Sequence, residues 1–256
     1  MIVTTEAIVL RSINYGETSQ IVTLYTRAMG TVAVIAKGAR GPKSRFGSAL
    51  QVMSHGQVVF YFKNSRNVHT LSESTHLTLF RRIYRELDRI AVGVPIIESI
   101  RVLMPHPEQD QLAFDVLLEV LTRLEEADDR WENLLPYFQL RLSAALGFAP
   151  ALDREDIRRI GSAGGFLSLT DGSVSESKPA EPSAPASRKA IRAIGVFVLT
   201  ELDTVMRMDL ERSVTLEVVK LVETYLRYHV EDFRPSRSKA VFDRILLDPE
   251  QKRGAA

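Results

Sequence analysis

The chain has 256 residues, of which 45% are hydrophobic and 25% charged, so it is long enough for one large globular domain or two modest ones. It contains no cysteine, which excludes disulfides, a thiol nucleophile and any thiolate zinc or iron–sulfur site. No apolar run is long enough to span a bilayer, and the N-terminal segment lacks the pattern of a signal peptide. We therefore expect a cytoplasmic protein with no membrane segment.

Charge is distributed unevenly along the chain. Residues 1–80 carry eight Lys and Arg against three Asp and Glu, a net charge of +5, although the whole chain carries only +1. The remaining residues must therefore sum to −4. This asymmetry indicates two surfaces with different partners.

The first 72 residues read as short strands of β-branched and apolar residues separated by turn residues. Strands are expected at residues 4–11, 20–26, 31–37, 57–63 and 68–72. Five strands, with a loop or short helical turn between the third and the fourth, are typical of an OB-fold barrel, which we place at residues 1–78. A five-stranded SH3-like barrel would give much the same sequence.

The segment that follows the third strand combines cations with glycines, and no Asp or Glu occurs from Thr18 to Ser72. Glycine lets the backbone approach a phosphate chain, Lys and Arg neutralise phosphates, and an aromatic ring such as that of Phe46 can stack on an unpaired base. The pattern predicts a nucleic-acid-binding surface. Its candidate residues are Arg27, Lys37, Arg40, Lys43, Arg45, Phe46, Lys63 and Arg66. The alternatives are an ordinary solvated loop and an RNA-binding or translation-associated OB-fold protein.

From Leu79 the apolar residues recur at the spacing of amphipathic helices, which predicts the first part of an all-α domain at residues 79–150. Helices are expected at residues 79–91, 96–103, 112–127 and 131–146. We expect a break at Val94–Pro95 and a C-terminal cap at Gly147. The apolar stripes are those of a helix-bundle core.

Residues 151–187 interrupt the helical pattern. The glycines between Gly161 and Gly172 predict a small irregular or β-hairpin insertion, and the tract from Ser173 to Ser187 contains almost no large apolar residue. Such a tract predicts a flexible linker, because it cannot bury enough apolar surface to offset the entropy of ordering. Helices are expected to resume at 188–206, 215–230 and about 238–247, forming the second part of the helical domain at 188–250.

Catalytic motifs are scarce. The five histidines show no metal-binding spacing, and the run from Gly38 to Ser44 differs from a phosphate-binding P-loop in its spacing and in Pro42, which has no N–H. We therefore favour a binding protein over an enzyme. An enzyme assembled from scattered side chains is the alternative, and Asp153, Glu155 or Asp156 close to a histidine would be its sign.

Five segments of the chain closely resemble the RecO family of bacterial recombination mediators. They are EAIVLRS (6–12), NYGETSQIVTLYT (14–26), AKGARGPKSRFGSAL (36–50), RLSAALGFAPALD (141–153) and ETYLRYHV (223–230). The resemblance implies an OB fold followed by a helical domain, binding of single- and double-stranded DNA, strand annealing, and loading of RecA, with RecR, on DNA coated by single-strand DNA-binding protein. It implies action at the nucleoid without catalytic turnover, and it adds Arg11 to the basic candidates.

One departure concerns zinc. Many members of the family carry a CxxC…CxxC zinc site where this chain has DREDIRRIGSAGGFLSLTDG, and by spacing Glu155, Arg158, Ser168 and Asp171 stand near the thiolate positions. Arginine cannot ligate zinc, and no soft ligand replaces the sulfurs. We predict no zinc and no other cofactor, with the insertion held by the packing of its apolar residues or by turn chemistry.

Overall fold

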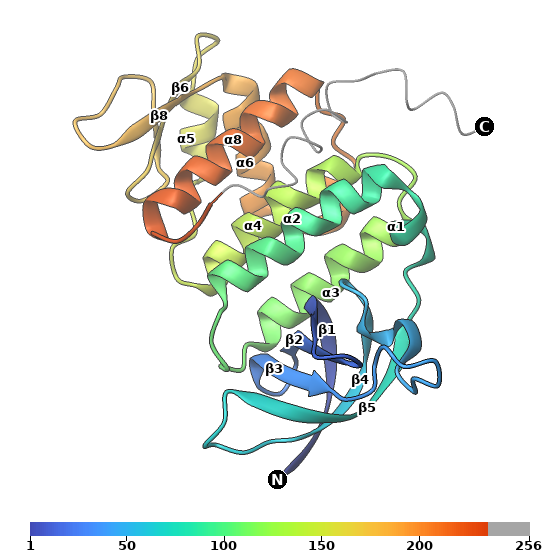
Figure 1. Ribbon diagram of the computed structural model, residues 1–256. Coiled ribbons are helices and arrows are strands. Elements are labelled where there is room, and N and C mark those ends of the chain that lie inside the picture. The colour runs from blue at the N-terminus through green and yellow to red at the C-terminus, as the bar shows by residue number, and fades with distance from the viewer. Residues whose placement is uncertain (235–256) are drawn as a thin grey trace. The chain divides into compact units, whose positions relative to one another are not determined.

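The computed structural model describes residues 1–234 (Figure 1). These residues divide into two compact units, of which the first comprises residues 1–85 and 100–125 and the second comprises residues 86–99 and those from 126 onward. The first unit therefore adds helical residues to the predicted barrel domain. The short helix expected at 238–247 lies outside the described residues.

Five strands of the first unit close into a barrel in the order β1-β2-β3-β5-β4 (Figure 1). Their bounds are β1 (Ile2–Tyr15), β2 (Ser19–Thr26), β3 (Gly30–Ala36), β4 (His55–Tyr61) and β5 (Val68–Thr78). All neighbours are antiparallel except β3 and β5, which run parallel, and a short helical turn, η1 (Gly47–Leu50), connects β3 to β4. This arrangement confirms the predicted OB-type barrel over the SH3-like alternative.

Strict alternation in β3 shows how the sequence builds the barrel. Val32 and Val34 are at most 4% exposed and face the core, whereas Ala33 and Ile35 are only partly buried and face outward. Side chains of successive strand residues point to opposite faces, so one face of each strand fills the barrel. The barrel core also includes Val22, Leu24, Val58, Phe60 and Leu71.

Two helices complete the first unit, α1 (Arg81–Arg85) and most of α3 (Gln111–Glu126). The ring of Phe114 on α3 stacks on Tyr25 of β2 with 6.1 Å between centroids, and both residues are fully buried. The connection before α3 also contacts the barrel, because the Thr31 hydroxyl donates to the Met104 carbonyl at 2.6 Å. A side chain at position 30 would collide with the Glu108 carbonyl, so Gly30, with φ of +64°, allows this close approach.

The second unit consists mainly of helices. They are α2 (Leu87–Leu103, whose last turn lies in the first unit), η2 (Trp131–Asn133), α4 (Leu134–Ala145), α5 (Arg154–Arg159), α6 (Arg188–Leu199), α7 (Leu202–Val205) and α8 (Arg212–His229). Gly147 caps α4 as predicted: it has φ of +84°, and the amides of Gly147 and Phe148 return to carbonyls of the last turn. Within residues 1–234, every helix is too short or too polar to span a bilayer.

The predicted break at Val94–Pro95 is wrong, because α2 continues through Pro95 and the interruption between α1 and α2 lies at Glu86. Proline inside a helix costs about 3 kcal/mol. The residues that follow it, Ile96 and Ile97, are at most 2% exposed, and each buried side chain of this kind contributes about 1.5–3 kcal/mol. Burial therefore outweighs the missing amide.

The predicted flexible linker is wrong in part, because it contributes strands to a small sheet of order β7-β6-β8. The strands are β6 (Gly165–Ser168), β7 (Val174–Ser175) and β8 (Ser183–Ala186). Strand β8 lies at an edge of this sheet and pairs with β6 on one side only. Proline, which has no amide hydrogen to donate, is tolerated in such an edge strand, as Pro185 is here. Leu167 and Ala186 are at most 6% exposed, so even this polar segment buries some apolar surface.

Candidate nucleic-acid interface

The basic loop, residues 37–46, is a series of tight turns. The amide of Gly41 donates to the Gly38 carbonyl at 3.1 Å, and the amide of Ser44 donates to the Gly41 carbonyl at 3.0 Å. Gly38 has φ of +70°, which favours glycine. The turns place four exposed cations on a compact segment. They are Lys37, Arg40, Lys43 and Arg45.

The loop is attached to the turn that joins β1 and β2. The amide of Arg40 donates to the Thr18 carbonyl at 2.8 Å, and its guanidinium donates to the Gly16 carbonyl at 3.4 Å. The last residue of β3, Ala36, pairs with Gln20 near the start of β2. The cations of the loop therefore begin where β3 ends, next to the turn that joins β1 and β2.

The outer face of this sheet carries one cation and several apolar side chains, and we call it the open face. Cross-strand pairing aligns Arg11 with Thr23 and Ala33, and it aligns Ile13 with Ile21 and Ile35. Residues directly opposite each other point to the same side of a sheet. The open face therefore comprises Arg11, Ile13, Tyr15, Ile21, Thr23, Ala33 and Ile35.

Tyr15 was missed by the sequence analysis. Its side chain is 55% exposed, and it is two residues beyond Ile13, so it faces the same side as Ile13 and Arg11. The sequence pattern predicted that the strand ends at Arg11, so Tyr15 lay outside it. A bulge between Val9 and Arg11 breaks the alternation of burial, and pairing with β2 then continues to Tyr15.

Lys63 and Arg66 are exposed but form a separate group in the loop between β4 and β5. This loop adjoins the start of β1, since the amide of Phe62 donates to the Met1 carbonyl at 2.8 Å. The basic loop adjoins the other end of β1, so this strand of 14 residues separates the two groups of cations. An exposed aromatic residue, Tyr61, precedes this second group and is 48% exposed.

Arg27 does not belong to either group. Its guanidinium lies 3.1 Å from a Glu6 carboxylate oxygen, forms a second ion pair with Asp115 and covers the Phe114 ring at 4.4 Å. Burial alone would lower the pKa of Arg27, but hydrogen bonds to Asp115 and Glu6 outweigh it and raise the pKa. Two carboxylates of the same unit thus compensate its charge, so Arg27 is not the uncompensated cation that the predicted phosphate contact needs.

Phe46 is not an exposed stacking surface, and that expectation is also corrected. Its side chain is 3% exposed and belongs to the barrel core together with Leu50. The guanidinium of Arg45 lies 5.2 Å from the centre of its ring. An aromatic side chain at the end of a polar loop gains more by filling the open end of the barrel than by facing water.

The acidic cluster near residue 155 has ordinary structural roles. Asp153 accepts a hydrogen bond from the Asp156 amide at 2.7 Å and caps α5, while Glu155 and Asp156 pair with Arg159. Among residues 1–234, no group of three or more His, Asp or Glu side chains is arranged to hold a metal ion. The sequence lacks the cysteines of a zinc site altogether.

Two of the four positions near the expected thiolates, Ser168 and Asp171, lie in a hydrogen-bonded turn, whereas Glu155 and Arg158 lie on α5. The Ser168 hydroxyl lies 2.7 Å from that of Thr170, and the Asp171 carboxylate accepts from the Ser173 amide at 2.9 Å. These hydrogen bonds, led by that from the Ser173 backbone, lower the pKa of Asp171. Turn chemistry therefore holds this part of the insertion.

Comparison with known proteins identifies the family. The family model for the N-terminal region of recombination protein O matches residues 1–80, and the model for its C-terminal region matches residues 84–238. A DNA repair protein RecO from Salinibacter ruber is 47% identical over 246 residues, which cover 95% of this chain and 94% of that protein. A DNA repair protein RecO from Chlorobium limicola is 29% identical over 260 residues, covering 96% of this chain and 99% of that protein.

The matches extend over both units, and the barrel seen in the structure has the fold that the N-terminal motifs imply. The chain therefore belongs to the RecO family of DNA repair proteins.

Proposed function

We propose that this chain is a DNA-binding recombination mediator that holds single- and double-stranded DNA on the open face and the basic loop. The observation that carries the proposal is the state of the four loop cations. All are exposed, and none forms an ion pair with a carboxylate among residues 1–234. In sequence the nearest acid is Glu17, in the turn that the loop contacts, and no Asp or Glu lies between Glu17 and Glu73.

Binding is mainly electrostatic and independent of sequence. Loop cations and Arg11 neutralise phosphates and release counterions, so affinity falls steeply as salt rises. Tyr15 offers an exposed ring beside the cations, on which an unpaired base can stack. Two strands held on one positive surface repel each other less, which favours annealing of complementary strands.

Protein partners are proposed for the rest of the chain. Residues 81–256 carry a net charge of −4, which disfavours DNA and leaves their surface to proteins. With RecR, the chain would assist loading of RecA on DNA coated by single-strand DNA-binding protein, and it would act at the nucleoid in the cytoplasm. Membership of the RecO family supports this assignment. No catalytic step is part of it.

The test is a quadruple variant in which Lys37, Arg40, Lys43 and Arg45 become Ala. Its affinity for single-stranded DNA, measured by fluorescence anisotropy from low to high salt, should show a logarithmic salt slope that is flatter by about 2.8, since each phosphate contact contributes about 0.7. Annealing should slow while far-ultraviolet circular dichroism is unchanged. A variant that retains the wild-type affinity and slope would remove the loop from the proposal.

The matched control removes the same charge from exposed positions of the second unit. Suitable residues are Arg158, Arg192, Lys220 and Arg227. The control should retain the wild-type slope. That result would show that the effect depends on where the removed charges lie and not on how many are removed. Tighter binding to an RNA oligomer than to DNA of the same sequence, without annealing, would instead favour an RNA-binding or translation-associated protein.

A further inference from the structure

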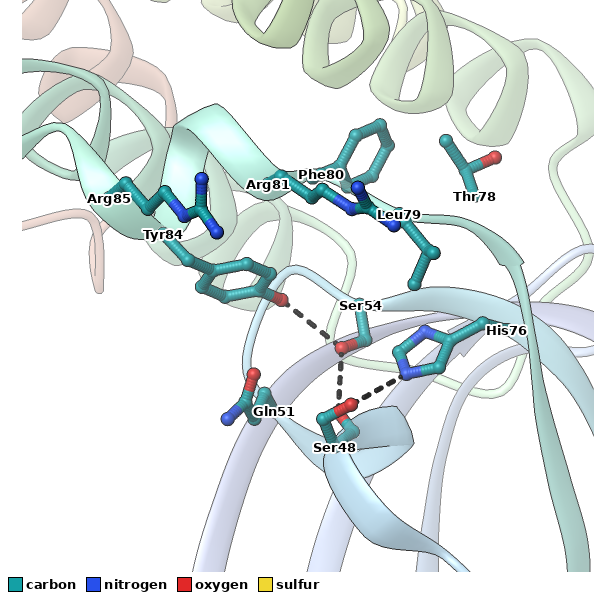
Figure 2. A pocket seen from close by; sticks show the side chains of 10 residues that line it. All are labelled: Ser48, Gln51, Ser54, His76, Thr78, Leu79, Phe80, Arg81, Tyr84 and Arg85. Atoms are coloured by element: carbon teal, nitrogen blue, oxygen red, sulfur yellow. Dashed lines mark hydrogen bonds between the residues drawn. The ribbon is translucent and has the colours of Figure 1, made fainter.

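A pocket lies in the first unit, beside the end of the basic loop. It is formed by η1, the end of β5 and α1, and its volume is about 230 Å³ (Figure 2). Arg81 and Arg85 line it from α1, Ser48 comes from η1, and His76 comes from β5. None of these four residues was a candidate from the sequence.

The floor of this pocket is fixed by hydrogen bonds (Figure 2). The Tyr84 hydroxyl donates to the Val52 carbonyl at 2.8 Å and lies 3.1 Å from the Ser54 hydroxyl. The Ser48 hydroxyl lies 3.0 Å from Nε2 of His76, while Nδ1 of His76 is buried with no hydrogen-bond partner. These hydrogen bonds hold the lining in place, and the contact with Ser48 ties His76 of β5 to η1.

The charge of the pocket is positive. Neither Arg81 nor Arg85 forms an ion pair with a carboxylate of the described residues, and both are exposed. The carboxylate of Glu125, on α3, accepts the Arg82 and Ile83 amides of α1 at 2.9 and 3.0 Å. Two guanidinium groups on one short helix are suited to a phosphate, because each can donate two parallel hydrogen bonds.

One wall is apolar. Leu79 lines the pocket beside the two arginines and is 53% exposed. A volume of about 230 Å³ is below the range of drug-sized ligand sites and suits one phosphate with its sugar or base. Charge and apolar wall together favour a nucleotide over a bare anion.

We propose that this pocket binds a single nucleotide unit of a strand that leaves the basic loop, with its phosphate between Arg81 and Arg85 and its sugar or base against Leu79. The route is short, because η1 starts at Gly47, directly after the last residue of the loop. This proposal rests on the proposed function, since the strand is the one held by the loop. It names a second contact on the barrel that the open face does not include.

The first test replaces Arg81 and Arg85 together by Ala in the full chain. The salt slope for single-stranded DNA should become flatter by about 0.7, the value for one phosphate. A control that replaces Arg192 and Arg227, exposed in the second unit, should leave the slope unchanged. Replacement of Arg81 and Arg85 by Lys should restore the slope, because charge is kept.

The second test probes the pocket without a DNA strand. Labelled histidine signals, with that of His76 assigned through a His76→Gln variant, are followed by nuclear magnetic resonance during titration with deoxythymidine monophosphate. The His76 signal should shift saturably in the wild type and in the control but not in the Arg81→Ala/Arg85→Ala variant. Inorganic phosphate should shift it only at higher concentration, since it cannot use Leu79.

The two tests separate failure of this proposal from failure of the proposed function. An unmoved His76 signal, with an unchanged salt slope in the Arg81→Ala/Arg85→Ala variant, would overturn the pocket while DNA binding through the loop stands. An equal response to inorganic phosphate would also overturn it, because the nucleotide would not be recognised. A saturable nucleotide shift in a protein whose loop variant binds DNA normally would support the pocket and refute the loop.

Discussion

Two sides of the same barrel differ in what covers them. On the open face, Arg11 and Tyr15 are exposed, and Tyr15 retains 55% of its surface. Farther along the outer face of β2, on what we call the covered side, Tyr25 is fully buried under Phe114, and Arg27, just after the strand, is paired with Glu6 and Asp115. Both sides carry an arginine and a tyrosine, so the residue types alone do not distinguish them.

This difference shows that contacts between distant segments decide which cations are paired with carboxylates. Asp115 and Phe114 lie on α3, which is almost 90 residues away from β2 in the sequence, yet they belong to the same unit as the barrel. Where α3 packs against the barrel, Arg27 is paired with carboxylates and covers an aromatic ring. Where no segment packs, an arginine such as Arg11 stays exposed and available for phosphates.

The largest effect is expected on the covered side. Replacement of Phe114 by Ala should lower the free energy of unfolding by about 3–5 kcal/mol, because a fully buried ring is lost from its contact with Tyr25. Denaturant unfolding measures the change. Replacement of Leu112, which is on the same helix but 73% exposed, should change the free energy by less than about 0.5 kcal/mol. Equal effects would refute the covered side as a packed interface.

The next effect distinguishes the two aromatic residues near the cations. Replacement of Tyr15 by Ala should weaken binding of single-stranded oligothymidine by about 1–3 kcal/mol, the contribution of one base stacked on an aromatic ring. Replacement of Phe46 by Leu keeps the barrel core filled and should leave affinity unchanged. Anisotropy titrations measure both, with thermal unfolding as a check on folding. A larger loss from Phe46→Leu than from Tyr15→Ala would reverse our assignment of the stacking surface.

The smallest effect concerns the two arginines. Replacement of Arg11 by Ala should flatten the logarithmic salt slope of DNA binding by about 0.7, since one phosphate contact is lost. Replacement of Arg27 by Ala should leave that slope unchanged, because Glu6 and Asp115 already compensate its charge. Salt titrations of both variants give the comparison directly. If Arg27→Ala flattened the slope and Arg11→Ala did not, the result would show that DNA displaces Glu6 and Asp115 from Arg27.

Several features of the fold follow from local patterns. The alternation in β3, with Val32 and Val34 inward, predicted a strand that the structure contains. The apolar spacing from Leu112 predicted a helix that matches α3 to within one residue at each end. Gly147 predicted the end of α4, because only glycine adopts positive φ there without strain.

Other features of the fold could not be predicted from local sequence patterns. Strand β1 continues to Tyr15 because pairing with β2 resumes after a bulge, and the break in alternation at Val9 and Leu10 hides this continuation. Helix α2 passes through Pro95 because buried isoleucines compensate it, and strand β8 forms in a Pro- and Ser-rich tract because β6 supplies its partner. In each case a contact outweighs a local preference.

By itself, the sequence determined that this protein has a cation-rich barrel without Asp or Glu from Thr18 to Ser72, a helical remainder and no cysteine for zinc, because composition and periodicity depend only on neighbours along the chain. Only the tertiary structure decided which of its cations and rings face water. Arg27 and Phe46 turned inward while Arg11 and Tyr15 stayed outside. The physical reason is that burial depends on which distant segments pack together, and that packing is not encoded in any single stretch of residues.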